Sequence, residues 1–274
     1  MATVSGEADM LATVERLATF YNWGPSLPVP QPERPVDYEP VTLTTVDGER
    51  LYARFHPGEP PASAGGCGGS EVTGPRSLPR PAVLFCHGNC GTLRRWRNIP
   101  ARWRAAVGAD VLTFNYRGYG RSTGRPTEAG LYADGHAALA YLKSRAAGPA
   151  LIVGQSLGGA VAVELATTAG CDALILESTF TGIADVPRRW PGGSWLAARM
   201  RNSFASVEKL AGFDRPLFVS HGTWDPLIPH AHADRLADVA AGPTKVLKIP
   251  GMGHSDRRGR NYEDEIAQFT KQYG

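Results

Sequence analysis

Hydrophobic residues along the chain fall into short apolar runs that alternate with longer amphipathic segments. The runs are rich in Val, Leu, Ile and Ala and predict buried strands at residues 81–86, 111–116, 150–153, 173–176, 216–220 and 245–249. Between them, apolar residues recur at helical spacing over residues 127–145, 160–166, 231–241 and 262–273. Strands that alternate with helices predict an α/β fold with a mostly parallel, doubly wound sheet that carries helices on both faces.

Two runs near the start of the chain have a different pattern. Residues 41–46 and 50–55 alternate apolar and polar side chains and flank the turn dipeptide Asp47-Gly48. This arrangement is typical of a β-hairpin. We therefore expect two antiparallel N-terminal strands to open the sheet.

The remaining segments define the predicted domain organisation. Residues 7–21 form an amphipathic pattern whose polar face is acidic, which argues against binding to an anionic membrane surface. We expect residues 1–40, this helix and a proline-rich connector, to pack on the body, and residues 41–274 to form the α/β domain. Within that domain, the Gly-, Pro- and Ser-rich residues 58–80 predict a flexible loop, and residues 181–213 form a short cap segment.

Composition and charge narrow the possible classes of protein. The 274 residues suffice for one large core, and the formal net charge of +3 does not call for a nucleic-acid partner. The four cysteines lack paired metal spacing, which favours reduced thiols. No apolar stretch approaches the ~18 residues of a membrane span, and Ala2 stands where N-myristoylation needs glycine. These features predict a soluble, cytoplasmic protein without a stable membrane anchor.

One strand–helix junction carries the pattern Gly-x-Ser-x-Gly, here Gly154-Gln155-Ser156-Leu157-Gly158. A buried strand before it and an Ala- and Val-rich helix after it are the context that a nucleophile elbow requires. Glycines on both sides allow the strand and the helix to pass closely, while the serine occupies strained backbone at the apex. The alternative is a Gly-rich turn with an incidental serine.

A nucleophilic serine needs a histidine base and an acid that orients the histidine. In a parallel sheet such groups gather where the carboxyl ends of the strands deliver their loops. Asp225 follows the predicted strand at residues 216–220, and His254 follows the one at residues 245–249. The chain order Ser156, Asp225, His254 is that of the α/β-hydrolase triad.

Each partner has a competing interpretation. Asp256 and Asp214 are alternative acids, but Asp256 follows the histidine too closely and Asp214 precedes its strand. His254 could be an ordinary surface histidine, although its glycine-flanked loop suits an exposed imidazole. His87 and His221 lie at the same edge, and each precedes glycine directly after a strand, which favours bracing of a loop by hydrogen bonds.

Two backbone N–H groups are candidate donors to the oxyanion of a tetrahedral intermediate. The Leu157 N–H lies at the first turn of the predicted helix, and the Asn89 N–H follows Gly88 in the loop after the strand at residues 81–86. The Asn89 side chain could also donate to the oxyanion, or it could form a turn. The sequence leaves these two roles open.

These motifs together resemble the α/β-hydrolase superfamily, and within it the small-cap serine hydrolases that include acyl-protein thioesterases and monoacylglycerol or lysophospholipid lipases. The resemblance spans most of the chain from about residue 41 onward and rests on six segments: His87-Gly88-Asn89, residues 115–122, residues 154–159, residues 177–180, residues 221–225 and Gly253-His254. Two features depart from the pattern. The lipidation or membrane anchor of several such relatives is missing, which weakens a depalmitoylase interpretation, and residues 58–80 look like an insertion.

The resemblance implies a role for each candidate residue. Ser156 is the nucleophile, His254 the base and then the acid, Asp225 the orienting acid, and Asn89 and Leu157 the oxyanion donors. Such a mechanism needs no metal or cofactor. The expected partner is a small-molecule ester rather than nucleic acid, and the expected assembly is a monomer or homodimer.

Aromatic and sulfur-containing residues on the edge loops and in the cap segment are candidates for an apolar acyl pocket; they are Tyr119, Phe180, Trp190, Trp195, Trp224 and Met252. Plain cap packing is an equal alternative for each. Four cap arginines could receive an anionic head group, although a solvated face is favoured; they are Arg188, Arg189, Arg199 and Arg201. Because the cap is short, we expect an open site.

The leading hypothesis is a serine carboxylic-ester hydrolase for short-to-medium acyl esters. A thioesterase, a lysophospholipase or a monoacylglycerol lipase is an alternative with the same chemistry. Haloperoxidase, C–C bond hydrolase and peptidase activities could use the same triad, whereas dehalogenases and epoxide hydrolases place Asp where this chain has Ser156. A non-catalytic binding module predicts a damaged triad, and this triad is intact.

Overall fold

A computed structural model describes residues 15, 19–20, 37–58, 79–89, 91–189, 191–256 and 258–273. Most of the predicted N-terminal helix and connector, most of the predicted loop at residues 58–80, and Trp190 lie outside the described residues. In the described part of the chain, none of the helices is long and apolar enough to cross a membrane.

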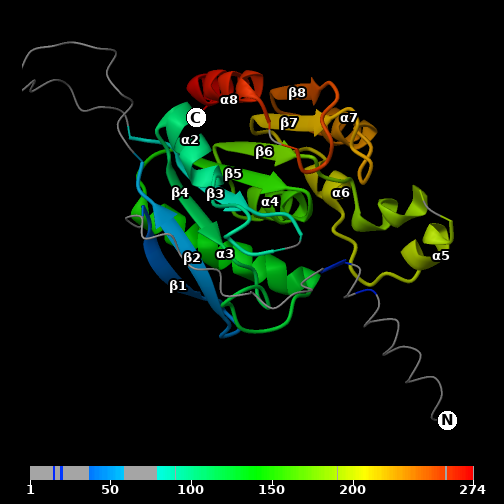
Figure 1. Cartoon of the computed structure of the whole chain (residues 1–274), viewed down its shortest axis with the longest axis horizontal. Helices are drawn as coiled ribbons and strands as arrows, with labels where there is room; N and C mark the ends of the chain where they lie inside the picture. Colours follow the sequence, from blue (N-terminus) through cyan, green and yellow to red (C-terminus); the bar gives the residue numbers. More distant parts are fainter. Residues whose placement is uncertain are drawn as a thin grey trace, which may run out of the picture.

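The described residues form one eight-stranded sheet in the order β1-β2-β4-β3-β5-β6-β7-β8 (Figure 1). The strands are β1 (Glu39–Thr44), β2 (Arg50–His56), β3 (Ala82–Cys86), β4 (Asp110–Phe114), β5 (Ala150–Gln155), β6 (Ala173–Glu177), β7 (Leu217–Gly222) and β8 (Thr244–Ile249). β1 and β2 pair antiparallel with each other, β2 pairs antiparallel with β4, and all other neighbours are parallel. The predicted strands and the antiparallel start of the sheet are therefore confirmed.

Helices cover both faces of the sheet (Figure 1). The helices and 3₁₀ turns are α2 (Ile99–Val107), α3 (Glu128–Arg145), α4 (Leu157–Thr168), η1 (Ile183–Asp185), η2 (Pro187–Arg189), α5 (Gly193–Ala197), α6 (Ser206–Leu210), α7 (Ala231–Asp238) and α8 (Arg260–Tyr273). α2 and α8 pack against each other over one apolar cluster, while α3, α4, α6 and α7 cover the larger cluster on the other face. The doubly wound α/β prediction is confirmed.

The sequence pattern did not predict α2. Its apolar stripe is short: Ile99, Trp103 and Val107 recur every four residues and pack on one apolar cluster, but of these only Trp103 is fully buried. Pro100 fits the first turn, where a missing N–H leaves no hydrogen bond unmade. The fully buried Trp103 ring instead ties the helix to the sheet.

The cap segment contains η1, η2, α5 and α6 and is anchored by an aromatic cluster. Phe204 is fully buried and contacts Phe180 edge to face, with ring centroids 6.5 Å apart. Phe20 contacts Phe204 in the same way at 6.1 Å. One oxygen of the Glu15 carboxylate accepts the backbone N–H of Arg201 at 2.7 Å. The described residues near the N-terminus are thereby joined to the cap.

Candidate active site

Ser156 lies at the sharp turn between β5 and α4, with φ of +52° and ψ of −119°. A positive φ is strained for a residue with a side chain and must be held by its surroundings. The Ser156 N–H donates to the Glu177 carbonyl at 2.9 Å, and the Thr179 hydroxyl donates to the Ser156 carbonyl at 2.7 Å. The segment at the end of β6 thus holds the turn on both sides.

Glycines make this turn possible. A Cβ on Gly158 would lie 2.0 Å from the Cys86 carbonyl oxygen, and a Cβ on Gly154 would lie 2.3 Å from the Gly158 carbonyl oxygen. Both distances are far below van der Waals contact. The close approach of β3, β5 and α4 that exposes Ser156 therefore requires glycine at these two positions.

The structure brings Ser156, His254 and Asp225 together. His254 Nε2 lies 3.1 Å from Ser156 Oγ, and His254 Nδ1 lies 2.7 Å from Asp225 Oδ2. Asp225 follows β7 and His254 follows β8, so adjacent strand ends deliver both side chains to the elbow. The competing acid Asp256 instead accepts the Gly253 N–H at 2.7 Å.

Asp225 is surrounded by donors. Its Oδ1 accepts the backbone N–H groups of Leu227 at 2.9 Å and Ile228 at 2.8 Å, and His221 Nε2 lies 3.2 Å from its Oδ2. Burial alone would raise the pKa of Asp225, but the hydrogen bonds from His221, His254 and Ile228 hold it well below its usual range. Asp225 is therefore a carboxylate that can orient His254.

His221 has a second contact that sequence reasoning missed. As expected, it braces a loop, because its Nε2 lies 2.9 Å from the Ile228 carbonyl oxygen. The same nitrogen also approaches Asp225. Its position four residues before Asp225 and directly before glycine was the available signal.

The loop after β3 lies against the nucleophile. A Cβ on Gly88 would be 3.3 Å from Ser156 Cβ. The Asn89 side chain is engaged elsewhere, since its Nδ2 donates to the Thr19 carbonyl at 2.7 Å and its Oδ1 accepts the Tyr119 hydroxyl at 2.9 Å. These contacts favour a loop-positioning role for the side chain.

Hydrogen bonds to His87 and Gly88 hold the backbone of this loop in place. His87 Nδ1 lies 2.7 Å from the Gly88 carbonyl oxygen, and burial lowers the pKa of His87 to about 4. The Tyr116 hydroxyl donates to the His87 carbonyl at 3.0 Å. Leu157 is the first residue of α4, so its N–H has no acceptor within the helix.

Of the six residues expected to line an acyl pocket, Trp190 lies outside the described residues, and the other five differ in exposure. Tyr119, Phe180 and Met252 are buried, whereas Trp195 and Trp224 are 56% and 76% exposed. None of these five described residues lines the cavities of about 80 Å³ and 450 Å³. Core packing accounts for the placement of Tyr119 and Phe180.

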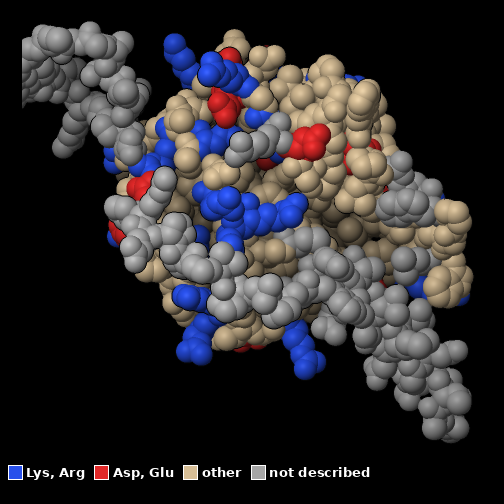
Figure 2. Space-filling model, in the orientation of Figure 1, with Lys and Arg blue, Asp and Glu red and all other residues tan. Residues whose placement is uncertain are grey.

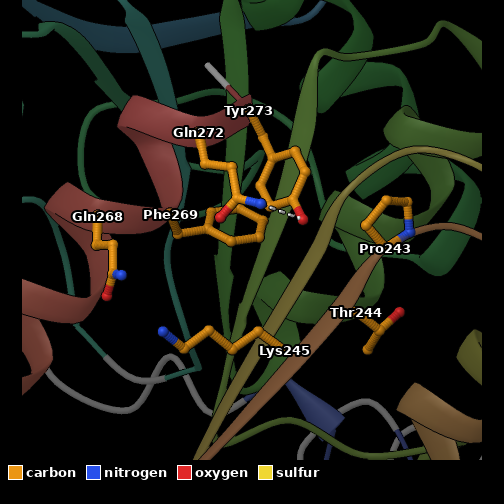
Figure 3. Close-up of a pocket in the computed structure, with 7 residues that line it drawn as sticks. All are labelled: Pro243, Thr244, Lys245, Gln268, Phe269, Gln272 and Tyr273. Atoms are coloured by element: carbon orange, nitrogen blue, oxygen red, sulfur yellow. Dashed lines mark hydrogen bonds between the residues drawn. The ribbon is translucent and has the colours of Figure 1, made fainter.

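One small cavity of about 80 Å³ lies between the start of β8 and the end of α8, lined by residues such as Lys245 and Phe269 (Figure 3). The amino-terminal ends of the parallel strands form this edge of the sheet. The triad residues follow the carboxyl ends, at the opposite edge. This cavity therefore takes no part in the site.

A buried ionic cluster lies beneath the site. Glu177 ends β6 and is fully buried. Arg102 Nη2 donates to its Oε1 at 2.8 Å, Arg258 Nη1 lies 3.3 Å from its Oε2, and the Tyr262 hydroxyl also donates to Oε1. The two guanidiniums hold the pKa of Glu177 below its usual range despite the opposing effect of burial. Sequence reasoning identified Glu177 only as part of a motif.

Comparisons with known proteins agree with this geometry. A family model described as "alpha/beta hydrolase fold" matches residues 81–215. An uncharacterised protein of Mycobacterium tuberculosis is 37% identical over 238 residues, which cover 84% of this chain and 78% of that protein. The uncharacterised protein YfhR of Escherichia coli is 30% identical over 271 residues, which cover 93% of this chain and 88% of that protein.

Among solved structures, an esterase of Pyrococcus furiosus is similar in fold. Its TM-score is 0.65 at 18% identity, and the match covers 89% of this chain and 97% of that chain. At this level of identity the likeness concerns the fold.

Proposed function

Because this chain belongs to the alpha/beta hydrolase superfamily, we propose that it is a serine hydrolase that cleaves carboxylic esters. The observation that carries the proposal is the unbroken set of contacts from Ser156 Oγ through both nitrogens of His254 to Asp225. A binding module would have no use for a strained serine placed 3.1 Å from an oriented imidazole.

The first half-reaction follows from this geometry. Ser156 Oγ attacks the ester carbonyl carbon while its proton moves to His254 Nε2. Asp225 Oδ2 accepts the Nδ1–H of His254, which leaves Nε2 free of a proton and stabilises the imidazolium that forms. The bond to the leaving alkoxide then breaks, and His254 returns the proton to that oxygen. The products are a free alcohol and an acyl group on Ser156.

The second half-reaction releases the acid. A water molecule gives a proton to His254 Nε2 and attacks the acyl carbon; the bond to Ser156 Oγ then breaks, and the serine recovers the proton. In both half-reactions the backbone N–H groups of Leu157 and Asn89 are proposed to donate hydrogen bonds to the negative oxygen of the tetrahedral intermediate. Each such donor contributes on the order of 3–4 kcal/mol to transition-state stabilisation.

The substrate range proposed is short-to-medium acyl esters of small molecules. Ser156 and His254 are both half-buried rather than fully buried, so the reacting groups keep access to solvent. The Pyrococcus furiosus neighbour is named an esterase, which supports ester chemistry over the peroxidase and C–C hydrolase alternatives. Thioesters are substrates of the same chemistry.

The test is hydrolysis of nitrophenyl acetate, butyrate, octanoate and palmitate by the wild type, Ser156→Ala and Ser144→Ala. Ser144 is an exposed serine in α3 and serves as the matched control. We expect Ser156→Ala to abolish hydrolysis and labelling by a fluorophosphonate, with Ser144→Ala unchanged and a maximum at short or medium chains. Equal rates for wild type and Ser156→Ala on every ester would refute the proposal.

A further inference from the structure

A second cavity of about 450 Å³ lies beside the candidate active site. Two of the residues that line it, Gln155 and Ser255, directly adjoin Ser156 and His254 in sequence. Trp96 forms part of its wall, and Gly88 lies between the Trp96 ring and Ser156. A Cβ on Gly88 would be 3.6 Å from that ring and 3.3 Å from Ser156 Cβ. A volume in this range accommodates a substrate group rather than a single water molecule.

Arginines carry the charge of this cavity. Arg95, Arg102 and Arg258 all line it. Figure 2 shows basic side chains gathered over the segment between β3 and α2, with acidic ones nearby. Arg102 and Arg258 both pair with the single buried carboxylate of Glu177. Two guanidiniums therefore share one negative charge, and buried charge of this kind is stable only when it is fully paired.

Several donors around the cavity have no acceptor. Within the described part of the chain, Trp96 Nε1, Arg102 Nε and Arg258 Nε are buried and make no hydrogen bond. Gln155 is 5% exposed and also lines the cavity, but its unpaired Oε1 is an acceptor and does not add to these donors. Buried N–H groups without partners are rare in native structures and are expected where an acceptor binds. An oxyanion supplies several acceptor atoms at once.

Acidic residues limit the charge that can bind. Asp256 and Glu263 also line the cavity. Asp256 is exposed and accepts the Gly253 N–H, so it belongs to the rim rather than the floor. Counted with Glu177, three carboxylates lie beside three arginines, so a polyanion is disfavoured. Among the described residues Arg95 is in no ion pair, and it is the arginine left to bind a single anionic group.

We propose that this cavity is a subsite for one anionic oxygen group of the substrate, a carboxylate or a phosphate monoester. The assignment rests on the proposed ester hydrolysis and adds a substrate class to it: esters that carry one such group near the scissile bond. Arg95 contacts the anion from the exposed side, with its guanidinium 5.7 Å from the Trp96 ring centroid. Arg102, Arg258 and Trp96 lie on its buried side.

The experiment compares kcat/KM of the full-length chain for neutral and anionic esters. The substrates are phenyl butyrate, 4-butyryloxybenzoate and 4-butyryloxyphenyl phosphate, together with phenyl hexanoate and monophenyl adipate, which place the charge on the acyl side. The variants are Arg95→Gln and, as control, Arg94→Gln. Arg94 and Arg95 are both exposed, but only Arg95 lines the cavity. Ratios between wild type and variant cancel the intrinsic reactivity of each ester.

We expect Arg95→Gln to lower kcat/KM about 10-fold for at least one anionic ester, the usual loss when a charged hydrogen bond is removed. The neutral esters and Arg94→Gln should stay within about two-fold, since exposed charges contribute little. Comparing the carboxylate with the phosphate ester then identifies the preferred anion. Unchanged ratios for every anionic ester overturn the subsite and leave the proposed function standing.

A different result separates the two proposals. If no ester is hydrolysed, the proposed function fails, and the subsite is tested by titrating inorganic phosphate against tryptophan fluorescence, because Trp96 lines the cavity. Saturable quenching that is about 10-fold weaker in Arg95→Gln but not in Arg94→Gln supports the subsite. Absence of saturable quenching, or equal quenching in all three proteins, overturns it.

Discussion

His221 Nε2 lies 3.2 Å from Asp225 Oδ2, the same oxygen that lies 2.7 Å from His254 Nδ1. The second neighbour of His221 Nε2 is the carbonyl oxygen of Ile228, so both of its partners are acceptors. This nitrogen therefore carries the ring proton. His221 and His254 thus donate to one carboxylate oxygen, and His221 is placed to fix the acid from a second direction.

Loss of the His221 N–H donor is expected to lower kcat strongly and to change KM little. His221→Leu should reduce kcat about 10- to 100-fold, the effect of one hydrogen bond to a charged group, with KM changed little. The pKa of Asp225 should also rise toward its usual value, so activity should decline further at acidic pH. His221→Gln keeps an N–H donor and should restore most of kcat. Equal kcat for all three proteins would contradict a positioning role.

Glu15 is expected to contribute strongly to stability. Its Oε1 accepts three N–H groups at 2.7 Å each, from the Arg201 backbone and from the Asn202 backbone and side chain. Glu15→Ala removes all three hydrogen bonds to this buried carboxylate and should lower the free energy of unfolding in urea by about 3 kcal/mol. The exposed pair of Glu39 with Arg145 provides the control, since Glu39→Ala should cost less than about 1 kcal/mol.

Gly158 is expected to tolerate no side chain. A Cβ there would lie 2.0 Å from the Cys86 carbonyl, so Gly158→Ala must displace β3 or α4. A shift of about 1 Å at the elbow should reduce kcat about 100-fold. Gly259→Ala is the matched control, because nothing lies within 4 Å of a Cβ at that position. Ester hydrolysis and circular dichroism of both variants test this; full activity in Gly158→Ala would contradict the observed packing.

Stability is expected to fall as the pH is lowered from about 6.5 to 4. Burial lowers the pKa values of His56 and His87 to about 4, whereas in the unfolded chain they protonate near pH 6.5. Within this window the unfolded state binds more protons at both sites, so each histidine lowers the free energy of unfolding by up to about 3 kcal/mol. The contribution of these two neutral histidines to the free energy of unfolding is fully present above pH 6.5 and is lost as the pH approaches 4.

One carboxylate opposes this trend. Burial raises the pKa of Asp134 to about 6, so between pH 4 and 6 the native state binds the extra proton there. The combined effect of the two histidines on the free energy of unfolding exceeds the opposite effect of Asp134. Urea unfolding between pH 7.5 and 4.5 should therefore show a net loss of stability. His87→Gln removes one titrating group and should flatten the profile. An unchanged slope would contradict the assignment of His87 as a buried neutral imidazole.

The sheet and the elbow could be predicted from sequence because both depend on local patterns. Apolar runs of strand length, together with the rule that loops gather at the carboxyl ends of parallel strands, were enough to select Asp225 and His254. The antiparallel opening followed from the Asp47-Gly48 turn. By contrast, the apolar stripe of α2 consists of only three residues, Ile99, Trp103 and Val107, and so short a pattern was missed.

The ionic cluster and the second cavity could not be found in this way. Glu177 meets Arg102 and Tyr262 across 75 and 85 residues of sequence, and no local pattern links them. The sequence also could not show which aromatic residues of the edge loops are buried. Tyr119 and Phe180 belong to the core cluster, whereas Trp195 and Trp224 are exposed.

The positive φ of Ser156 matters when variants of this protein are selected for thermal stability. Holding a side chain in that backbone region costs on the order of 1–3 kcal/mol, and glycine at the same position would avoid much of this cost. We therefore expect Ser156→Gly to raise heat resistance while it removes the nucleophile. A mutant library screened only for survival at high temperature would enrich for it, so stability and turnover must be selected together at this residue.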